Sequence, residues 1–293
     1  MTERTVLVTG ATGQQGGATA RALLTAGWHV RALVRDPGAP AARRLAEAGA
    51  EIVPGDMGDR DSLAEAVRGA HGVFSVQPAA GPPHGVAEEV RLGVNVADAA
   101  HAAGVRHLVY ASVGGADRDS GISHWNTKWE IEQHIRALGV PATILRPVMF
   151  MENHARPHYG VTGDAALVRV IPPRATVQLI AVTDIGAFAA LAFADPDRYV
   201  GKALELAGDE LSRDALVAAI GRATGRPVDV EPIPAERRAA LGLGAADMEA
   251  VDSFGGWRAD IPALRALHPG LMDFETWLER EGKVQFDALF AAS

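Results

Sequence analysis

The sequence predicts an α/β protein: a doubly wound parallel sheet with a smaller C-terminal α/β lobe. The first observation is that six short apolar segments alternate with helix-forming segments in the first half of the chain. Such crossovers build a parallel sheet with helices on both faces. The second is that segments such as 108–111 are apolar without alternation, as in strands covered on both faces. We therefore expect the sheet domain over residues 1–150 and the smaller lobe over 151–293. The chain could also cross between the two.

The first predicted strand runs into a glycine-rich turn, and the helix-forming segment 18–24 follows. Because glycine has no Cβ, such a turn lets the backbone approach a diphosphate closely. The helix N-terminus behind it offers free N–H groups and a positive dipole end. This context favours a dinucleotide site over a tight structural turn. The residues of the turn that we expect at the cofactor are Gly10, Thr12, Gly13, Gln15 and Gly16.

The remaining elements follow from apolar patterns and stop signals. The later strands of the sheet domain are expected at 29–35, 51–54, 72–77, 106–111 and 142–146. Its later helices are expected at 41–48, 61–68, 86–103 and 123–138. Asp61 is the expected N-cap of its helix. The smaller lobe is expected to contain strands at 177–182, 203–207 and 228–231 and helices at 185–194, 213–224, 248–254 and 274–278, with Asp184 capping the first of these helices.

Composition excludes several classes of function. The net charge of −8 and the pI of about 5.7 argue against a broad nucleic-acid-binding surface. The absence of cysteine excludes disulfides, thiolate nucleophiles and cysteine–zinc sites. The sequence shows no signal-peptide pattern and no apolar run of the ~20 residues that a membrane helix needs. We therefore expect a cytoplasmic protein.

The end of the second strand bears on the choice of dinucleotide. An acid roughly 20 residues beyond the glycines binds the ribose 2′-hydroxyl, whereas an arginine there accommodates a 2′-phosphate. Arg35 and Asp36 are adjacent and give opposite signals. Because a guanidinium binds phosphate with two N–H groups, we favour NADP(H) over NAD(H). Arg31, Arg43 and Arg44 are expected to add positive charge.

Two further strand ends complete the expected cofactor site. Asp56 and Met57 follow the third strand and are expected near the adenine, and Gln77 ends the fourth strand. A plain turn after Gly55 is the alternative interpretation of Asp56. For Arg35, the alternative is a solvated surface side chain.

Several stretches resemble the NmrA-like branch of the atypical short-chain dehydrogenases/reductases, over most of the chain. These stretches are 8–17, 30–37, 55–59, 103–112, 124–130, 145–153 and 182–186. The resemblance implies a Rossmann cofactor domain, a C-terminal substrate lobe, and NAD(P) bound at Gly10, Gly13, Gly16 and Arg35. This family contains NADPH-dependent reductases, quinone oxidoreductases and cofactor-binding regulators without catalysis.

The candidate catalytic residues depart from the usual pattern of short-chain reductases. Those enzymes use a serine, and a tyrosine four residues before a lysine. The lysine holds the nicotinamide ribose and lowers the tyrosine pKa, so that the tyrosine protonates the carbonyl. Ser112 and Lys128 stand where that serine and lysine would stand, but His124 replaces the tyrosine. His124 shares a helix face with Lys128 and an imidazole can donate a proton; the alternative is a role in helix capping or packing.

The segment after the sixth strand resembles the family segment that passes the nicotinamide and lines the substrate pocket. We expect Pro147 at the cofactor, and Val148, Phe150 and Asn153 at the substrate. The alternative for Asn153 is that it holds the loop.

No metal site is expected. His154 and His158 are four residues apart, as metal ligands on a helix can be. Pro157 argues against a helix there, however, and no carboxylate completes a ligand set.

Two functions remain open from the sequence. The first is an NADPH-dependent oxidoreductase that transfers hydride to a small quinone, carbonyl or enone-type acceptor. Quinones take hydride without a strong enzyme acid, so the missing tyrosine does not exclude this reaction. The alternative is a non-catalytic NAD(P)-binding redox sensor that binds a protein partner. A homodimer is left open, and neither nucleic acid nor membrane is an expected partner.

Overall fold

The computed structural model describes residues 4–78, 85–118, 121–156, 160–161, 166–169, 176–232, 236 and 254–291. Contacts divide the chain into two units. The first comprises Met1–Asp117, Ser123–Arg146 and Thr183–Leu204, and the second comprises Arg118–Ile122, Pro147–Val182 and Glu205–Ser293. The chain therefore passes between the units several times.

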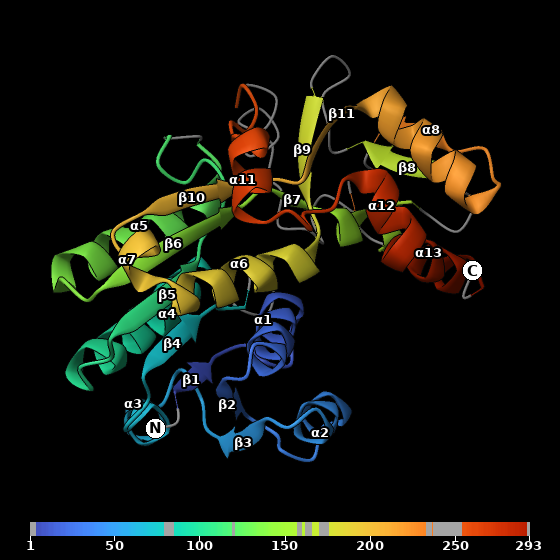
Figure 1. Cartoon of the computed structure of the whole chain (residues 1–293). Helices are drawn as coiled ribbons and strands as arrows, with labels where there is room; N and C mark the ends of the chain where they lie inside the picture. Colours follow the sequence, from blue (N-terminus) through green and yellow to red (C-terminus); the bar gives the residue numbers. More distant parts are fainter. Residues whose placement is uncertain are drawn as a thin grey trace. The chain divides into compact units, whose positions relative to one another are not determined.

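The first unit is built on a seven-stranded sheet of order β10-β6-β5-β4-β1-β2-β3 (Figure 1). Its strands are β1 (Thr5–Val8), β2 (His29–Val34), β3 (Glu51–Pro54), β4 (Gly72–Ser75), β5 (His107–Ala111), β6 (Ala142–Pro147) and β10 (Ala203–Leu206). The pairs from β3 through β1 to β6 are parallel. The strand order reverses between β1 and β4, and this switch point is where doubly wound sheets bind ligands. The predicted fold class is confirmed.

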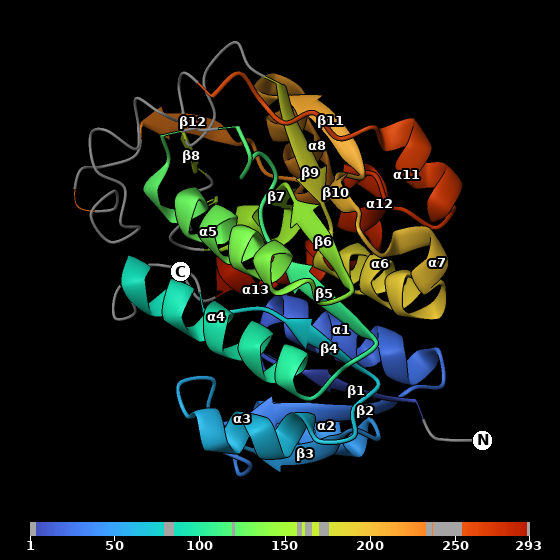
Figure 2. The same ribbon diagram turned by 90° about the vertical axis from the view of Figure 1, so that its left-hand side faces the viewer.

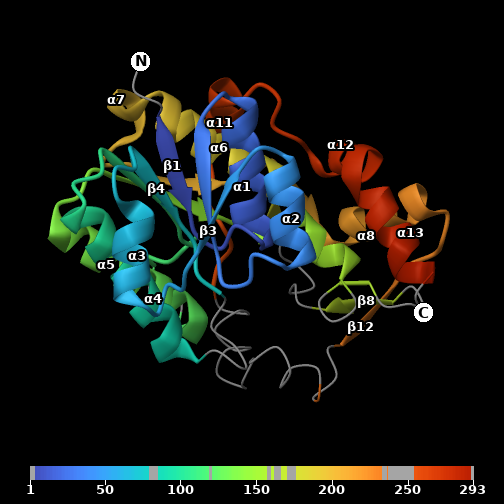
Figure 3. The same ribbon diagram turned by 90° about the horizontal axis from the view of Figure 1, so that it is seen from below.

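Helices cover both faces of this sheet (Figures 2 and 3). They are α1 (Gln14–Thr25), α2 (Pro40–Glu47), α3 (Arg60–Val67), α4 (Val86–Ala102), α5 (Ser123–Leu138), α6 (Val182–Ala194) and α7 (Pro196–Tyr199). Helices α3, α4 and α5 bury an apolar layer against one face, with Leu63, Val96 and Ile131 among its members. On the other face, α6 approaches α1 so closely that a Cβ on Gly186 would lie 2.6 Å from the carbonyl carbon of Ala18.

The second unit has its own core. A three-stranded sheet of order β11-β9-β7 and the parallel pair β12-β8 form its strands. These are β7 (Met149–Phe150), β8 (Ala166–Arg169), β9 (Thr176–Ile180), β11 (Asp209–Ser212) and β12 (Asp229–Pro232). Its helical elements are η1 (Met151–Ala155), α8 (Arg213–Thr224), α11 (Ile261–Leu267), α12 (Phe274–Trp277), η2 (Leu278–Gly282) and α13 (Lys283–Ala291). The fully buried aromatic side chains Phe274, Trp277 and Phe286 pack in this core.

Three details differ from the sequence-based expectations. Asp59, not Asp61, caps α3, because its carboxylate accepts the backbone N–H groups of Asp61 and Ser62. Asp184 lies within the first turn of α6, since that helix already begins at Val182. Strand β10, expected among the smaller lobe, pairs with β6 as a seventh strand of the main sheet. The expected helix at 248–254 lies mostly outside the described residues.

A buried histidine makes the first unit sensitive to acid. His107 on β5 is 1% exposed; its Nε2 lies 2.8 Å from Thr143 Oγ1 and its ring packs against Phe193. Burial, with a smaller contribution from His71, lowers the His107 pKa to about 4. Its folded pKa thus lies below the ordinary value of 6.5, so the unfolded chain binds the proton first and stability falls as pH drops from about 6.5 to 4.

We expect His107 alone to cost roughly 2 kcal/mol of unfolding free energy by pH 5 relative to pH 7. Urea titrations of wild type and His107→Gln across this range measure it, because glutamine has no proton to gain. The difference between the two proteins should shrink by that amount as the pH falls. A constant difference would contradict the assignment.

Candidate functional site

The glycine turn after β1 is shaped by contacts that exclude side chains. Gly10 has a φ of +57°, and a Cβ there would lie 2.7 Å from Val76 Cγ1. A Cβ on Gly16 would lie 2.3 Å from the carbonyl oxygen of Gly10, and one on Gly13 would lie 3.2 Å from the same atom. The hydroxyl of Thr9 donates to the Val76 carbonyl and accepts the Val76 N–H, which ties β1 to the end of β4. The turn is therefore tightly packed where side chains would stand, and a ligand would meet its backbone.

The start of α1 is arranged to receive an anion. Its N-cap is Gly13, whose position provides no side-chain cap, and its first turn has no acidic residue. The N–H groups of this turn thus point outward without a negative partner among the described residues. Gln15 places a buried Oε1 nearby that has no partner in the described part of the chain, while Thr12 is exposed. The uncapped N–H groups fit the diphosphate of a dinucleotide, whereas the Gln15 oxygen can bond only to a donor.

A pocket of about 210 Å³ adjoins the turn. It is lined by Ala11, Thr12, Gly13, Gly17, Arg21, Ala41, Arg44, Leu45 and Ala48. A Cβ on Gly17 would lie 3.4 Å from Nη1 of Arg21, so this guanidinium lies over the first turn of α1. Neither Arg21 nor Arg44 has a carboxylate partner among the described residues. Two guanidinium groups beside the positive end of a helix repel it, and a bound anion would offset this repulsion.

The residues at the end of β2 have distinct surroundings. Arg35 is exposed and makes no hydrogen bond or ion pair within the described ranges. The Asp36 carboxylate accepts the Gly38 N–H at 2.8 Å, so it shapes the local turn. Arg31 was expected to add positive charge at the cofactor. Its guanidinium instead donates to the Glu51 carboxylate and to the Arg68 carbonyl. Of the two adjacent side chains, Arg35 is therefore the one without a partner in the described part of the chain.

The expected adenine-side residues form a compact turn after β3. Asp56 Oδ1 accepts the Gly58 N–H at 2.6 Å and its backbone N–H donates to Ser62 Oγ. The Met57 carbonyl accepts from Asn95 Nδ2, and the Met57 side chain packs on the apolar layer below α3 and α4. Asp56 thus serves the turn whether or not a ligand binds, and contact with adenine stays a prediction.

Gln77 and Ser112 follow two neighbouring strands of the sheet. The register pairs Ser75 of β4 with Tyr110 of β5, and each of the two residues lies two positions further on. Gln77 is 6% exposed; its Nε2 donates to Ser75 Oγ, while its Oε1 has no partner among the described residues. Ser112 is 4% exposed, and its hydroxyl donates to Glu132 Oε1 at 2.6 Å.

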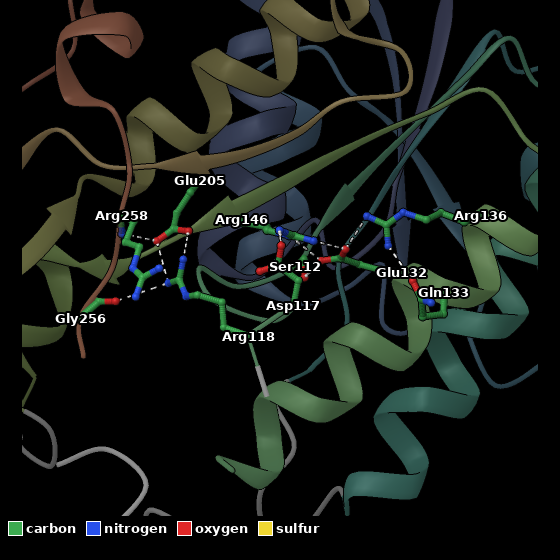
Figure 4. Close-up of polar contacts among 10 residues, drawn as sticks. All are labelled: Ser112, Asp117, Arg118, Glu132, Gln133, Arg136, Arg146, Glu205, Gly256 and Arg258. Atoms are coloured by element: carbon green, nitrogen blue, oxygen red, sulfur yellow. Dashed lines mark hydrogen bonds and ion pairs between the residues drawn. The ribbon is translucent and has the colours of Figure 1, made fainter. Parts of the chain in front are cut away.

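Ser112 borders a charge network that was not predicted from the sequence (Figure 4). The Glu132 side chain is 0% exposed and faces Arg146, which donates to both of its carboxylate oxygens at 2.9 and 2.7 Å. Arg146 also bonds Asp117 at 2.5 Å, and the partly exposed Arg136 bonds Glu132 from the solvent side. Burial alone lowers the Arg146 pKa, but the bonds and charges of Glu132 and Asp117 raise it overall. One available signal was an arginine inside an otherwise apolar strand, which requires a buried carboxylate.

Lys128 on α5 is also paired. Its Nζ lies 2.6 Å from Glu89 Oε1, and Glu89 is 1% exposed on α4. Thr127 donates to the other Glu89 oxygen at 2.6 Å. His124 belongs to the same helix, but its side chain lies outside the described residues, so its expected role as a proton donor stays a prediction.

Pro147, expected at the cofactor, and the expected substrate residues belong to the second unit. Pro147 and Val148 are buried, and the Val148 N–H donates to the Leu206 carbonyl. Phe150 is partly exposed at the start of η1, and the Asn153 carbonyl accepts the Arg156 N–H. Contacts of these residues with cofactor or substrate stay predictions.

Glu152 on η1 is a buried carboxylate whose charge lowers the stability of the folded protein. It is 6% exposed; its Oε1 accepts the Val182 N–H at 2.9 Å and its Oε2 has no partner among the described residues. Burial raises the Glu152 pKa to about 7, against the smaller lowering effect of the Val182 N–H. With a folded pKa above the ordinary 4.5, the folded state holds the proton longer, so stability falls as pH rises from about 4.5 to 7.

Glu152→Gln is expected to relieve that cost, because glutamine resembles the protonated acid and still accepts from Val182. Its free energy of unfolding should gain roughly 2–3 kcal/mol over wild type between pH 5 and pH 8. Denaturant titrations at the two pH values measure the change. An equal difference between the proteins at both pH values would contradict it.

Two kinds of feature are not found among the residues that the structure describes. No cluster of three or more histidine or acidic side chains is arranged to hold a metal ion there. His158, part of the expected metal spacing, lies outside these ranges. No described helix has both the length and the apolarity to cross a membrane.

Known proteins resemble this chain in sequence. The profile of the NmrA-like family matches residues 2–254. The chain is 31% identical over 255 residues to the NmrA-like family domain-containing oxidoreductase FrzB of Cladobotryum sp, covering 78% of this chain and 76% of FrzB. It is 35% identical over 230 residues to the (4-alkanoyl-5-oxo-2,5-dihydrofuran-3-yl)methyl phosphate reductase of Streptomyces griseus, covering 78% of this chain and 77% of the reductase.

Solved structures share the fold at lower identity. NmrA, a negative transcriptional regulator solved in complex with NADP, superposes with a TM-score of 0.80 at 21% identity over 98% of both chains. The NADPH-dependent quinone oxidoreductase QOR2 of Escherichia coli, complexed with NADPH, gives 0.76 at 24% identity over 94% of this chain and 98% of its own. With the family profile spanning most of its length, this chain belongs to the NmrA-like family.

Proposed function

We propose that this protein is an NADPH-dependent oxidoreductase that transfers hydride to a small quinone, carbonyl or enone-type acceptor. The observation that carries the proposal is the turn at Gly10, Gly13 and Gly16, whose shape and uncapped helix fit a diphosphate. Relatives above 30% identity named as oxidoreductase and reductase support hydride transfer as the use of this site. The nicotinamide, when bound, supplies the hydride, and the residues of the chain bind and orient it.

Lys128 is the residue that we assign to the nicotinamide ribose. An ammonium group has three N–H donors, and the ion pair with Glu89 engages at most one of them. Two donors remain for ribose hydroxyls, while Glu89 fixes the direction of the side chain. Because quinones and enones spread the negative charge that hydride brings, solvent can protonate them afterwards. The reaction then needs no tyrosine.

Arg35 supports NADPH as the cofactor, since it is a cation at the end of β2 that has no partner among the described residues. We expect Arg35→Ala to weaken NADPH binding roughly 10- to 100-fold, the range of a lost charge-assisted hydrogen bond, and NADH binding less than about threefold. Fluorescence titration with each cofactor measures both constants. Arg43→Ala is the matched control, because Arg43 is exposed on α2 and does not line the pocket. Equal losses for both cofactors in Arg35→Ala would reject the 2′-phosphate assignment.

A second function is favoured by a specific observation. Both residues at the usual catalytic positions are engaged inside the protein, Ser112 with Glu132 and Lys128 with Glu89. A protein that only senses NAD(P) needs the turn and not free catalytic groups, and the fold is also that of a negative transcriptional regulator. The alternative is therefore a redox sensor that binds a protein partner.

The deciding experiment measures NADPH oxidation by the purified protein against a panel of quinones, aldehydes and enones. Lys128→Met alone would leave Glu89 buried and unpaired, so it is compared with Lys128→Met combined with Glu89→Gln. Turnover that is lost in both variants, in proteins that remain folded and bind NADPH, would support the enzyme. Tight NADPH binding without turnover on any acceptor would support the sensor.

A further inference from the structure

The ends of β4 and β5 differ from the rest of the glycine-turn region in hydrogen-bond polarity. At the turn, the chain offers N–H donors and guanidinium groups without a carboxylate partner among the described residues, which suit phosphates. At the neighbouring strand ends, the hydroxyl hydrogen of Ser112 and one of the two Gln77 N–H groups are bonded within the protein. Both side chains still offer an acceptor.

Ser112 shows this most clearly. A serine hydroxyl has one hydrogen, and that hydrogen lies in the 2.6 Å bond to Glu132 Oε1. The carboxylate cannot be the donor, because Arg146 and Arg136 both donate to it. Ser112 Oγ therefore retains only lone pairs for a ligand and cannot polarise a substrate carbonyl by donation.

Gln77 independently offers an unpaired acceptor. Its Nε2 donates to Ser75 Oγ, which leaves the buried Oε1 without a partner among the described residues. An unpaired buried carbonyl oxygen destabilises the protein. This cost is removed when a ligand places an N–H or O–H against it. Gln77 and Ser112 each lie two residues beyond the paired residues Ser75 and Tyr110, so the two acceptors belong to the ends of neighbouring strands.

We propose that Gln77 and Ser112 form an acceptor pair that receives hydrogen-bond donors of the nicotinamide–ribose half of the cofactor, and that Glu132 is the positioning residue that fixes its polarity. The inference rests on the proposed function, because it assumes that a dinucleotide binds. In a doubly wound sheet the dinucleotide lies across the switch point, so its nicotinamide half falls on the β4–β5 side. That half carries two kinds of donor, the carboxamide N–H and the ribose hydroxyls.

The test compares the binding of four ligands by calorimetry. They are NADP⁺, its 3-acetylpyridine analogue, which lacks the carboxamide N–H, 2′-phospho-ADP-ribose, which lacks nicotinamide, and adenosine 2′,5′-bisphosphate, which lacks the second ribose. Ser112→Ala and Gln77→Met each remove one acceptor. Arg136→Ala is the matched control, because Arg136 contacts Glu132 from the exposed side without contacting Ser112.

We expect each acceptor variant to bind NADP⁺ roughly 3- to 10-fold more weakly, the range of one hydrogen bond, with adenosine 2′,5′-bisphosphate unchanged. Loss confined to NADP⁺ would identify the carboxamide as the donor. Loss shared by NADP⁺, the acetylpyridine analogue and 2′-phospho-ADP-ribose would identify a ribose hydroxyl. Glu132→Gln should reproduce the Ser112→Ala pattern although Glu132 does not touch the ligand, whereas Arg136→Ala should not.

Two outcomes would overturn the inference. One is NADP⁺ binding that neither acceptor variant weakens. The other is equal weakening of all four ligands, which would indicate a general structural effect. Failure of wild type to bind any of the four would instead reject the proposed function, so the two failures are distinguishable. Should Glu132→Gln fail to fold, Ser112→Ala and Gln77→Met still decide the question.

Discussion

Gly16→Ala is expected to lower NADPH affinity roughly 100-fold or more, a loss of about 3 kcal/mol. Its new Cβ would lie 2.3 Å from the Gly10 carbonyl oxygen and 2.8 Å from that of Thr9. Both atoms belong to the backbone, so the turn itself must move, and with it the N–H groups that receive the diphosphate. Calorimetry with NADPH measures the loss, and thermal unfolding shows whether the protein remains folded.

Alanine substitutions at two other glycines serve as comparisons for Gly16→Ala. Gly13→Ala should have a smaller effect, because its Cβ would lie 3.2 Å from the Gly10 oxygen and a shift of a few tenths of an ångström relieves the contact. Gly85, which also precedes a helix, has a φ of −76° and open space around a Cβ, so Gly85→Ala should bind NADPH as wild type does. Unchanged affinity in a folded Gly16→Ala protein would show that the cofactor does not use this turn.

Arg146→Ala is expected to destabilise the protein by about 3–5 kcal/mol, the cost of removing one partner of a buried ion pair. The Glu132 side chain, 0% exposed, would lose both bonds from Arg146 and keep only Arg136 and Ser112. The free energy of unfolding in urea measures the effect. Arg146→Lys should be intermediate, because an ammonium keeps the charge but not the two parallel bonds.

The control uses the exposed side of the same network. The Arg136 side chain is 43% exposed, so Arg136→Ala should cost less than about 1 kcal/mol. If the loss of stability comes from the unpaired Glu132 carboxylate, Arg146→Met combined with Glu132→Gln should be more stable than Arg146→Met alone. An Arg146→Ala protein within about 1 kcal/mol of wild type would show that this pair adds little to stability.

Local sequence patterns predicted the main sheet well. Glycine and apolar spacing place β3, α5 and α8 at their observed bounds, since these signals act between residues close in the chain. The cap of α3 was misplaced by two residues, because Asp59 and Asp61 are both good capping residues and only the backbone path selects one. The strand β10 was assigned to the wrong group, because pairing with β6 joins segments about 60 residues apart, which no local pattern encodes.

The sequence by itself determined the turn, its helix and the order of the strands, because glycine geometry and apolar periodicity are local properties. Only the tertiary structure decided which polar groups are free. Ser112 meets Glu132 across 20 residues, and Lys128 meets Glu89 on another helix. Arg31 donates to Glu51, whereas Arg35, four residues later in the chain, has no partner among the described residues. A hydrogen bond satisfies a side chain only where folding brings its partner, so the chemistry left for a ligand depends on the fold.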